Sequence, residues 1–251
     1  GRFGLMAAGN DLPVGHWERK QPLTLLKFLT HHLGRPVHRE RLIELMWPDC
    51  DETQGRERLK VTLYYLRHQL RDAGIEGEVI ETVGSTYILK RDMVWIDNLA
   101  FEDLYLEGEG HARAGRADKA VQCLEEAQRL YRGDYLEEDL YTDWCAEERE
   151  RLCEIYIDVL GRLADAYATD GSYASAAQIC RSALVREPCR EHFHRSLMDY
   201  LFLLGRRDQA ISQFQRCETI LAKELGVEPS TETRRLHEKI LHSAYASSPT
   251  T

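Results

Sequence analysis

The second half of the chain repeats with a spacing of 34 residues. Gly171 and Gly205 lie 34 positions apart, and so do Ala176 and Ala210. Similar small residues recur earlier, in 115–120. A glycine that ends one helix, followed by an alanine that lets the next helix pack closely, is typical of stacked helix-turn-helix repeats of this length. The spacing therefore predicts stacked helical pairs, and the alternative is an irregular helical bundle.

Hydrophobic periodicity locates these helices, and no convincing strand pattern follows Leu99. Glycine, proline and Asp-Gly breaks separate the apolar stripes. The predicted helices cover 101–114, 117–131, 144–168, 173–186, 191–204, 208–225 and a final segment after 229–230. Ser230 or Thr231 is the expected N-cap of that last helix. This part of the chain is predicted to be all-α.

The first hundred residues follow another pattern. Apolar residues at helical spacing predict a helix over 23–33, a second over 38–46 and a longer third helix over 53–73. The period then changes to that of a β-hairpin over 79–89. Two short helices, a third helix and a hairpin, in this order, predict a winged helix-turn-helix domain.

The third helix has side chains of different chemistry on its different sides. Leu59, Leu63, Leu66 and Leu70 form an apolar stripe that faces a core. A second face carries Arg56, Lys60, Tyr64, Arg67 and Arg71, and a third face carries Arg58, Thr62, Tyr65 and Gln69. Such cationic faces neutralise phosphates and read base edges in a major groove. The alternative interpretation is a row of charges that only solvates the helix.

The beginning of the third helix combines good and poor helix formers. Asp51 or Thr53 is the expected N-cap. Gly55, close to this end, disfavours a helix by about 1 kcal/mol relative to alanine. The sequence alone offers no compensating reason for a glycine at this position.

Charge is distributed unevenly along the chain. The net charge of the whole chain is -9, but residues 1–95 hold 14 Lys and Arg against 13 Asp and Glu, a net of +1, so that 96–251 has a net of -10. Within 53–71 there are five basic residues against one acid. A local basic stripe on a nearly neutral domain is typical of a module that contacts DNA through one face.

Composition excludes several classes of protein. The seven cysteines are widely spaced and form no CxxC, which argues against a disulfide framework and a structural zinc site and favours a reducing compartment. No apolar run approaches the roughly 20 residues that span a bilayer. The first ten residues lack the features of a secretory signal. We therefore expect a cytoplasmic protein, and we expect that this chain is cut from a longer one.

Two segments of the first domain resemble a known family. The run Gly34-Arg35-Pro36-Val37-His38-Arg39-Glu40-Arg41-Leu42 and the later Met46-Trp47-Pro48-Asp49 resemble the DNA-binding domain of OmpR/PhoB-type regulators, closest to the Streptomyces antibiotic regulatory proteins. Residues 55–67 are similar to the recognition helix of that family and residues 81–89 to its wing. Unlike the family pattern, the wing tip at 84–86 carries no Arg or Lys.

The remainder resembles the bacterial transcriptional activator domain, a tetratricopeptide-like module. The matching segments are Tyr131-Arg132-Gly133-Asp134-Tyr135-Leu136, residues 143–152 and Leu225-Gly226-Val227-Glu228-Pro229-Ser230-Thr231-Glu232-Thr233. The resemblance implies a winged-helix domain at 1–95, an activator domain at 96–245 and a disordered tail at 246–251. It also implies that the helical domain supports activation through self-association on DNA or contact with RNA polymerase.

We therefore predict a sequence-specific DNA-binding regulator that contacts DNA through a defined set of side chains. The residues expected to contact DNA are Arg56, Arg58, Lys60, Tyr64, Arg67, Arg71, Thr53, Arg39, Ser85 and Thr86. No GxSxG, Walker-type or GxGxxG motif occurs, so we expect no enzyme and no cofactor. We expect no metal either, because the HxH at 192–194 is a poor chelate on a helix.

Two alternatives from other classes remain open. The winged helix could bind protein instead of DNA, which would make the chain an interaction scaffold. The helical domain could also hold a small-molecule or peptide effector on its concave surface.

Overall fold

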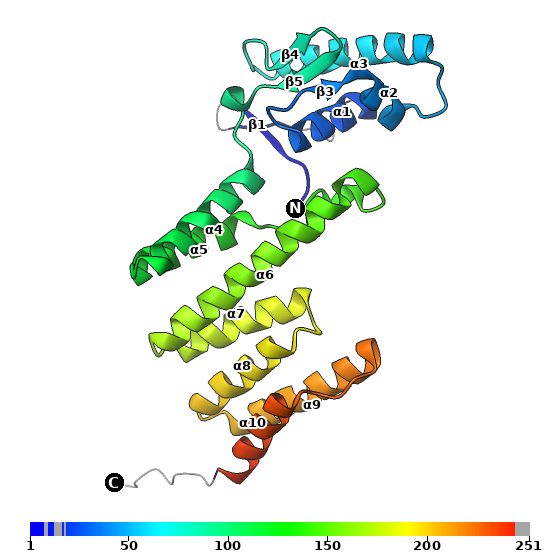
Figure 1. Cartoon of the computed structure of the whole chain (residues 1–251). Coiled ribbons are helices and arrows are strands. Elements are labelled where there is room, and N and C mark those ends of the chain that lie inside the picture. The colour runs from blue at the N-terminus through cyan, green and yellow to red at the C-terminus, as the bar shows by residue number, and fades with distance from the viewer. Residues whose placement is uncertain (8–9, 13–16, 18, 244–251) are drawn as a thin grey trace. The chain divides into compact units, whose positions relative to one another are not determined.

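The computed structural model of the chain describes residues 1–7, 10–12, 17 and 19–243 (Figure 1). The tail expected at 246–251 lies outside the described residues. The chain divides into two compact units, one formed by 1–97 with 133–149 and the other by 98–132 with 150–251. The first unit is a winged helix and the second is a helical repeat, so the predicted fold class is confirmed. No helix among the described residues is both long and apolar enough to span a membrane.

The first unit contains a helical trio and a small sheet, seen at the top of Figure 1. The helices are α1 (Lys20–His31), α2 (Arg39–Met46) and α3 (Glu52–Asp72). The antiparallel strands are β3 (Val37–His38), β4 (Ile80–Val83) and β5 (Thr86–Leu89), in the order β3-β5-β4. The predicted hairpin is therefore present. Strand β3 escaped prediction because two residues are too short to show an alternating pattern.

A separate hairpin precedes these elements. Strands β1 (Leu5–Ala7) and β2 (Asn10–Leu12) pair antiparallel, with Leu5 opposite Leu12. Phe3 and Leu5 are partly buried against the core of the winged helix. The beginning of the chain thus contributes apolar surface to that core.

The core of the first unit is built from the stripes that the sequence analysis identified. Leu25 and Phe28 of α1, Leu42 of α2 and Leu66 of α3 are almost completely buried, with Ile80 and Leu89 of the hairpin beside them. Burial of such side chains contributes about 1.5–3 kcal/mol each. The spacing of the leucines therefore determines which side of α3 is turned away from solvent.

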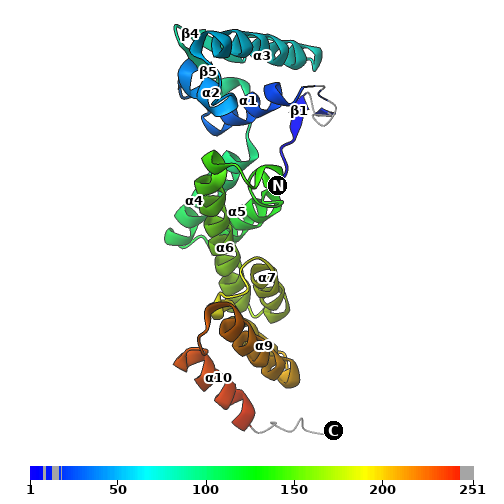
Figure 2. The same ribbon diagram turned by 90° about the vertical axis from the view of Figure 1, so that its right-hand side faces the viewer.

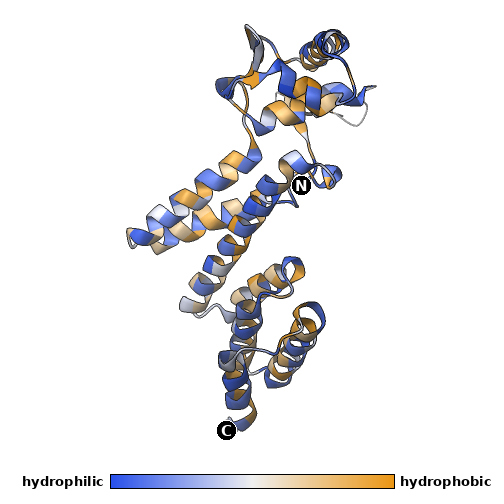
Figure 3. Ribbon diagram, turned by 45° about the vertical axis from the view of Figure 1, so that its right-hand side comes forward, coloured by the Kyte–Doolittle hydropathy of each residue, from blue (hydrophilic) through white to orange (hydrophobic). Residues whose placement is uncertain are grey.

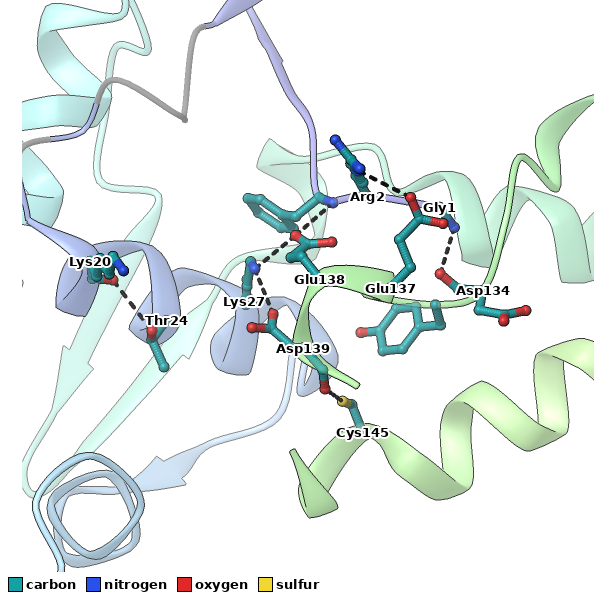
Figure 4. A network of polar contacts seen from close by, with 12 residues as sticks. Gly1, Arg2, Lys20, Thr24, Lys27, Asp134, Glu137, Glu138, Asp139 and Cys145 are labelled. Carbon is teal, nitrogen blue, oxygen red and sulfur yellow. Dashed lines mark hydrogen bonds and ion pairs between the residues drawn. The ribbon is translucent and has the colours of Figure 1, made fainter. Parts of the chain in front are cut away.

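Residues 133–149, which the sequence analysis places in the helical domain, pack in the first unit. The buried amine of Lys27 lies 2.5 Å from a carboxylate oxygen of Asp139 and 2.8 Å from one of Glu138 (Figure 4). Burial would raise the pKa of Glu138, but the hydrogen bonds from Lys27 and from the Phe3 amide hold it below its usual value. The ion pairs therefore attach this segment to α1.

Other contacts of the same segment reach the beginning of the chain and the aromatic side of α1. The N-terminal amine of Gly1 donates to the backbone carbonyl of Asp134 at 2.7 Å, as Figure 4 shows. The ring of Trp144 lies edge-on to Phe28, with 5.2 Å between their centroids. Trp144, expected in a core or an interface, is thus part of the winged-helix core.

The second unit consists of successive helices. They are α4 (Asp97–Arg113), α5 (Ala117–Leu130), α6 (Ala146–Thr169), α7 (Tyr173–Arg186), α8 (Glu191–Leu203), α9 (Arg207–Leu225) and α10 (Thr231–His242). Helices α7, α8 and α9 pack against one another in succession (Figures 2 and 3), and each contributes buried hydrophobic residues. Ser230 caps α10 by accepting a hydrogen bond from the amide of Thr233.

The 34-residue period corresponds to a repeated backbone turn. Gly115, Gly171 and Gly205 all have positive φ, between 71° and 77°. After each glycine, the next amide donates to the carbonyl five residues earlier, at 2.8–3.0 Å, which is the Schellman pattern. The alanine five residues after each glycine is buried. These observations confirm the tetratricopeptide-like interpretation.

Candidate nucleic-acid interface

Helix α3 begins at a side-chain cap. Asp51 accepts a hydrogen bond from the amide of Gln54 at 2.9 Å, so Asp51 and not Thr53 is the N-cap. Thr53 lies exposed in the first turn. The leucine stripe then holds the helix against α1 and α2. The cap and the stripe together determine which side chains of α3 reach solvent.

The solvent-facing side of α3 carries a mixture of cationic, aromatic and apolar groups. Lys60, Tyr64 and Arg71 are exposed there, and Tyr64 retains 59% of its accessible surface. Val61, absent from the predicted contact residues, is a β-branched residue that is 46% exposed in the middle of the helix. Its position outside the leucine stripe is the sequence feature that could have identified Val61 as a surface residue. Such a methyl-bearing side chain suits contact with a thymine methyl group.

Thr62 is a correction to the predicted third face. Only 4% of its surface is exposed. Its hydroxyl donates to the Arg58 carbonyl of the preceding turn at 2.8 Å. Thr62 lies at the edge of the leucine stripe, so it packs inside the unit and does not belong to the outer surface.

The cations of α3 differ in how their charge is already compensated. Arg56 pairs with Glu52 one turn earlier, and the pair is solvent-exposed and therefore weak. In the described part of the chain no acidic group pairs with Arg58, Lys60 or Arg71. The Nε of Arg71 donates only to the Arg67 carbonyl, at 3.3 Å.

The side chain of Arg67 forms its hydrogen bonds with the wing. Its Nη2 donates to the Ile80 carbonyl and to the Thr82 hydroxyl, both at 2.8 Å. Glu78 lies near the same guanidinium, at 3.8 Å. These bonds fasten β4 to α3, so Arg67 positions the wing relative to the helix.

The wing tip is fastened to the beginning of α2. The amide of Arg39 donates to the Ser85 carbonyl at 2.8 Å, and the Ser85 hydroxyl lies 2.7 Å from Nε2 of His38. Thr86 is paired with His38 in the sheet and donates its hydroxyl to the Val83 carbonyl. The structure thus brings Arg39, Ser85 and Thr86 into one cluster.

A hollow of about 350 Å³ lies between α1 and α3. Arg58, Val61 and Tyr65 line it from α3, and Trp47 and Arg19 contribute from the other side. The Arg19 guanidinium stacks over the Tyr65 ring, 3.9 Å from its centroid. Arg19 escaped the sequence analysis because it precedes the first predicted helix. Glu57 also lines the hollow, and its one carboxylate is outnumbered by the two guanidinium groups. The lining is therefore cationic overall, which suits an anionic occupant.

A winged helix with an exposed cationic recognition helix, joined to a helical repeat, defines a DNA-binding transcription regulator. Two family models match the chain: the C-terminal domain of transcriptional regulatory proteins over residues 19–87 and the bacterial transcriptional activator domain over residues 96–241. The second model covers more than half of the chain. The chain belongs to the bacterial transcriptional activator domain family.

Individual relatives are regulators of the same type. The chain is 27% identical to the regulatory protein DnrI of Streptomyces peucetius over 245 residues, which cover 95% of this chain and 90% of DnrI. It is 28% identical to the transcriptional regulatory protein EmbR of Mycobacterium tuberculosis over 248 residues, but spans only 63% of EmbR.

One solved structure shares the fold. The structure of Mycobacterium tuberculosis EmbR in complex with a low affinity phosphopeptide matches 96% of this chain and 63% of the EmbR chain, with a TM-score of 0.78 and 24% identity. These comparisons confirm the resemblance to the Streptomyces antibiotic regulatory proteins and the role of the chain in transcription regulation.

Proposed function

We propose that α3 enters the major groove of a DNA site and that Lys60, Tyr64 and Val61 form the centre of its contact with the bases and backbone. The observation that carries the proposal is the absence of acidic partners for Arg58, Lys60 and Arg71 in the described part of the chain. Unpaired cations on an exposed helix are free to replace the counterions of phosphates. Arg56 exchanges its exposed partner, Glu52, for a phosphate at little cost.

Phosphates flanking the groove are contacted by residues outside the middle of α3. Arg58 and Arg19 hold one phosphate at the hollow of about 350 Å³, where the guanidinium groups provide several donors. Thr53 and Arg39 lie near the beginnings of α3 and α2, where a helix dipole favours an anion. Ser85 and Thr86 contribute neutral hydroxyl groups at the wing.

The decisive experiment selects bound duplexes from a random pool with the unchanged chain and with Lys60→Ala and Val61→Ala variants. We expect one enriched sequence with the unchanged chain and relaxed selection at the positions facing the altered side chains. A pool that shows no enrichment, together with no duplex binding at low salt, would favour the scaffold alternative over DNA recognition.

Self-association on DNA is the route to activation that we favour, through an exposed patch of the segment 133–149, which packs in the first unit. Tyr141 is fully exposed and neighbours Leu140, which is 56% exposed. Exposed aromatic and aliphatic anchors of this kind are typical of protein interfaces. Sedimentation can compare binding of the chain to DNA with one site and to DNA with two sites. We expect two copies of the chain to bind the two-site DNA cooperatively, and Tyr141→Ser to weaken this cooperativity. Loss of activation without loss of pairing would identify RNA polymerase as the partner of this surface.

A second candidate function is effector binding. A pocket of about 360 Å³ lies between α7, α8 and α9, and Arg181 and Arg216 line it with Ser212 and Gln213. Neither arginine has an acidic partner in the part of the chain that the structure describes. Asp208 also lines the pocket. Because the two guanidinium groups outnumber this carboxylate, the pocket suits a small carboxylate or phosphate. Thermal shift with such anions should stabilise the unchanged chain but not Arg216→Ala, and equal shifts for both proteins would count against this site.

A further inference from the structure

Three side chains with metal-binding atoms converge on the paired helices α4 and α5. Glu107 and His111 lie one turn apart on α4, and Cys123 lies on α5, with their ligand atoms all within 4.8 Å of one another. The described residues contain no second group of this kind. Positions four apart on a helix share one face, so this pair has the chelating geometry that the HxH at 192–194 lacks.

Helices α4 and α5 approach each other closely at Gly108. A Cβ added at Gly108 would lie 3.3 Å from the Leu124 side chain and 3.4 Å from the Cys123 Cβ. Such contacts are tighter than ordinary van der Waals contacts, so a side chain here would push α5 or its side chains a few tenths of an ångström away. The close approach brings the Cys123 thiol beside the two ligands of α4. The cluster therefore results from helix packing as well as from side-chain reach.

We propose that Glu107, His111 and Cys123 bind one Zn²⁺ ion. A thiolate, an imidazole and a carboxylate are the ligands that Zn²⁺ takes in proteins. Around a tetrahedral ion with bonds of about 2.0–2.3 Å, ligand atoms lie about 3.5 Å apart. The Nε2 of His111 is already 3.5 Å from a Glu107 oxygen. Because Glu107 is exposed, its carboxylate has room for the remaining adjustment.

Three protein ligands leave the fourth position of a tetrahedral ion open to water. Such an ion exchanges more readily than one closed in by four side chains. The site thus binds Zn²⁺ reversibly and responds to the supply of the ion.

Arg116 disfavours Zn²⁺ binding through its hydrogen bond to His111. Its Nε donates to Nδ1 of His111 at 3.0 Å, which leaves the ring proton on Nε2, toward Glu107. A metal on Nε2 moves that proton to Nδ1, where it faces a cationic donor. A hydrogen-bond acceptor at position 116 would instead favour the tautomer that carries its proton on Nδ1, which leaves Nε2 free to bind the metal. The outer partners of metal-bound histidines act in the same way. Arg116→Gln should therefore tighten metal binding.

The test uses Co²⁺ as a spectroscopic substitute for Zn²⁺ in the full chain under reducing conditions. We expect one equivalent of Co²⁺ to produce a thiolate-to-cobalt charge-transfer band, which Zn²⁺ displaces. Cys123→Ser should abolish the band, His111→Ala should weaken binding by at least about tenfold, and Arg116→Gln should tighten it severalfold. Cys50→Ser, in the other unit, is the matched control and should leave the band unchanged.

Circular dichroism establishes that each variant retains its helices. Absence of the band in the folded unchanged chain, or a band that persists in Cys123→Ser, would overturn the site. An affinity of Arg116→Gln equal to that of the unchanged chain would overturn the assignment of Nε2 as the ligand atom.

Discussion

A Cβ placed on Gly55 would lie 2.3 Å from Cγ2 of Ile43, because α3 crosses α2 at this glycine. Ile43 is buried, with 7% of its surface exposed. The glycine that disfavours the helix in isolation is therefore the residue that lets the two helices of the helix-turn-helix touch.

Gly55→Ala should destabilise the first unit although alanine favours a helix. Overpacking costs about 1–3 kcal/mol, which exceeds the gain of about 1 kcal/mol in helix propensity. We expect a net loss of about 1 kcal/mol in the free energy of urea unfolding. In the background Ile43→Ala, which removes the obstructing methyl group, the same change should be neutral or stabilising. Equal effects in both backgrounds would contradict this explanation.

Lys27→Met should loosen the segment 133–149. The Lys27 amine is 7% exposed and pairs with Glu138 and Asp139, so its removal leaves two carboxylates close together without a cation. Because those carboxylates are partly solvated, we expect a loss of about 2 kcal/mol in the free energy of unfolding. Hydrogen exchange should increase at 134–142. Unchanged exchange there would show that the apolar contacts of Trp144 suffice.

Lys60→Ala and Arg58→Ala should each weaken binding to the selected duplex by about fivefold. Each should also reduce the slope of log affinity against log salt by about 1, because one phosphate contact is lost. Arg2→Ala is the control, since Arg2 is an exposed cation paired with Glu137. Slopes that stay the same in all three variants would place the phosphate contacts elsewhere.

Arg67→Ala should act mainly through the wing. The lost bonds to the Ile80 carbonyl and the Thr82 hydroxyl leave a partly buried carbonyl without its donor, which costs about 1–3 kcal/mol. Exchange of the β4 amides should accelerate, while the salt slope stays close to that of the unchanged chain. A slope reduced by a full unit, with a stable wing, would instead identify Arg67 as a phosphate ligand.

Acidification should destabilise the helical unit through His194. The ring is buried between the Pro188 carbonyl, 2.8 Å from Nε2, and the Gln213 amide, 2.6 Å from Nδ1. Burial lowers its pKa below 6.5, so the unfolded chain binds the proton more readily. This stabilisation is complete above about pH 6.5 and is lost as the pH falls toward the folded-state pKa.

The measurement compares urea unfolding at about pH 7.5 and about pH 5.5 for the unchanged chain and for His194→Gln. The variant should be less stable at the higher pH but should lose less stability between the two, by up to about 1.4 kcal/mol per pH unit. An identical loss in both proteins would assign the acid sensitivity to other groups.

Periodic features of the sequence predicted most of the fold. The leucine stripe of α3, the glycine turns of the helical unit and the hairpin each depend on interactions between near neighbours, which a spacing pattern reveals. The pairing of β3 and the role of Gly55 depend on a distant segment, so spacing gave no sign of them. Arg67 illustrates the same limit at the site, because its place in the cationic row does not reveal its hydrogen bonds to β4.

The chain passes from the winged-helix unit to the helical unit after residue 97, returns at 133 and leaves again after 149. A fragment that ends at residue 95 would therefore lack part of the very unit it is meant to isolate. Its Lys27 would remain without carboxylates and its Phe28 without the indole of Trp144. A fragment meant to contain the DNA-binding unit should therefore extend through Arg149, because a shorter one is expected to fold poorly.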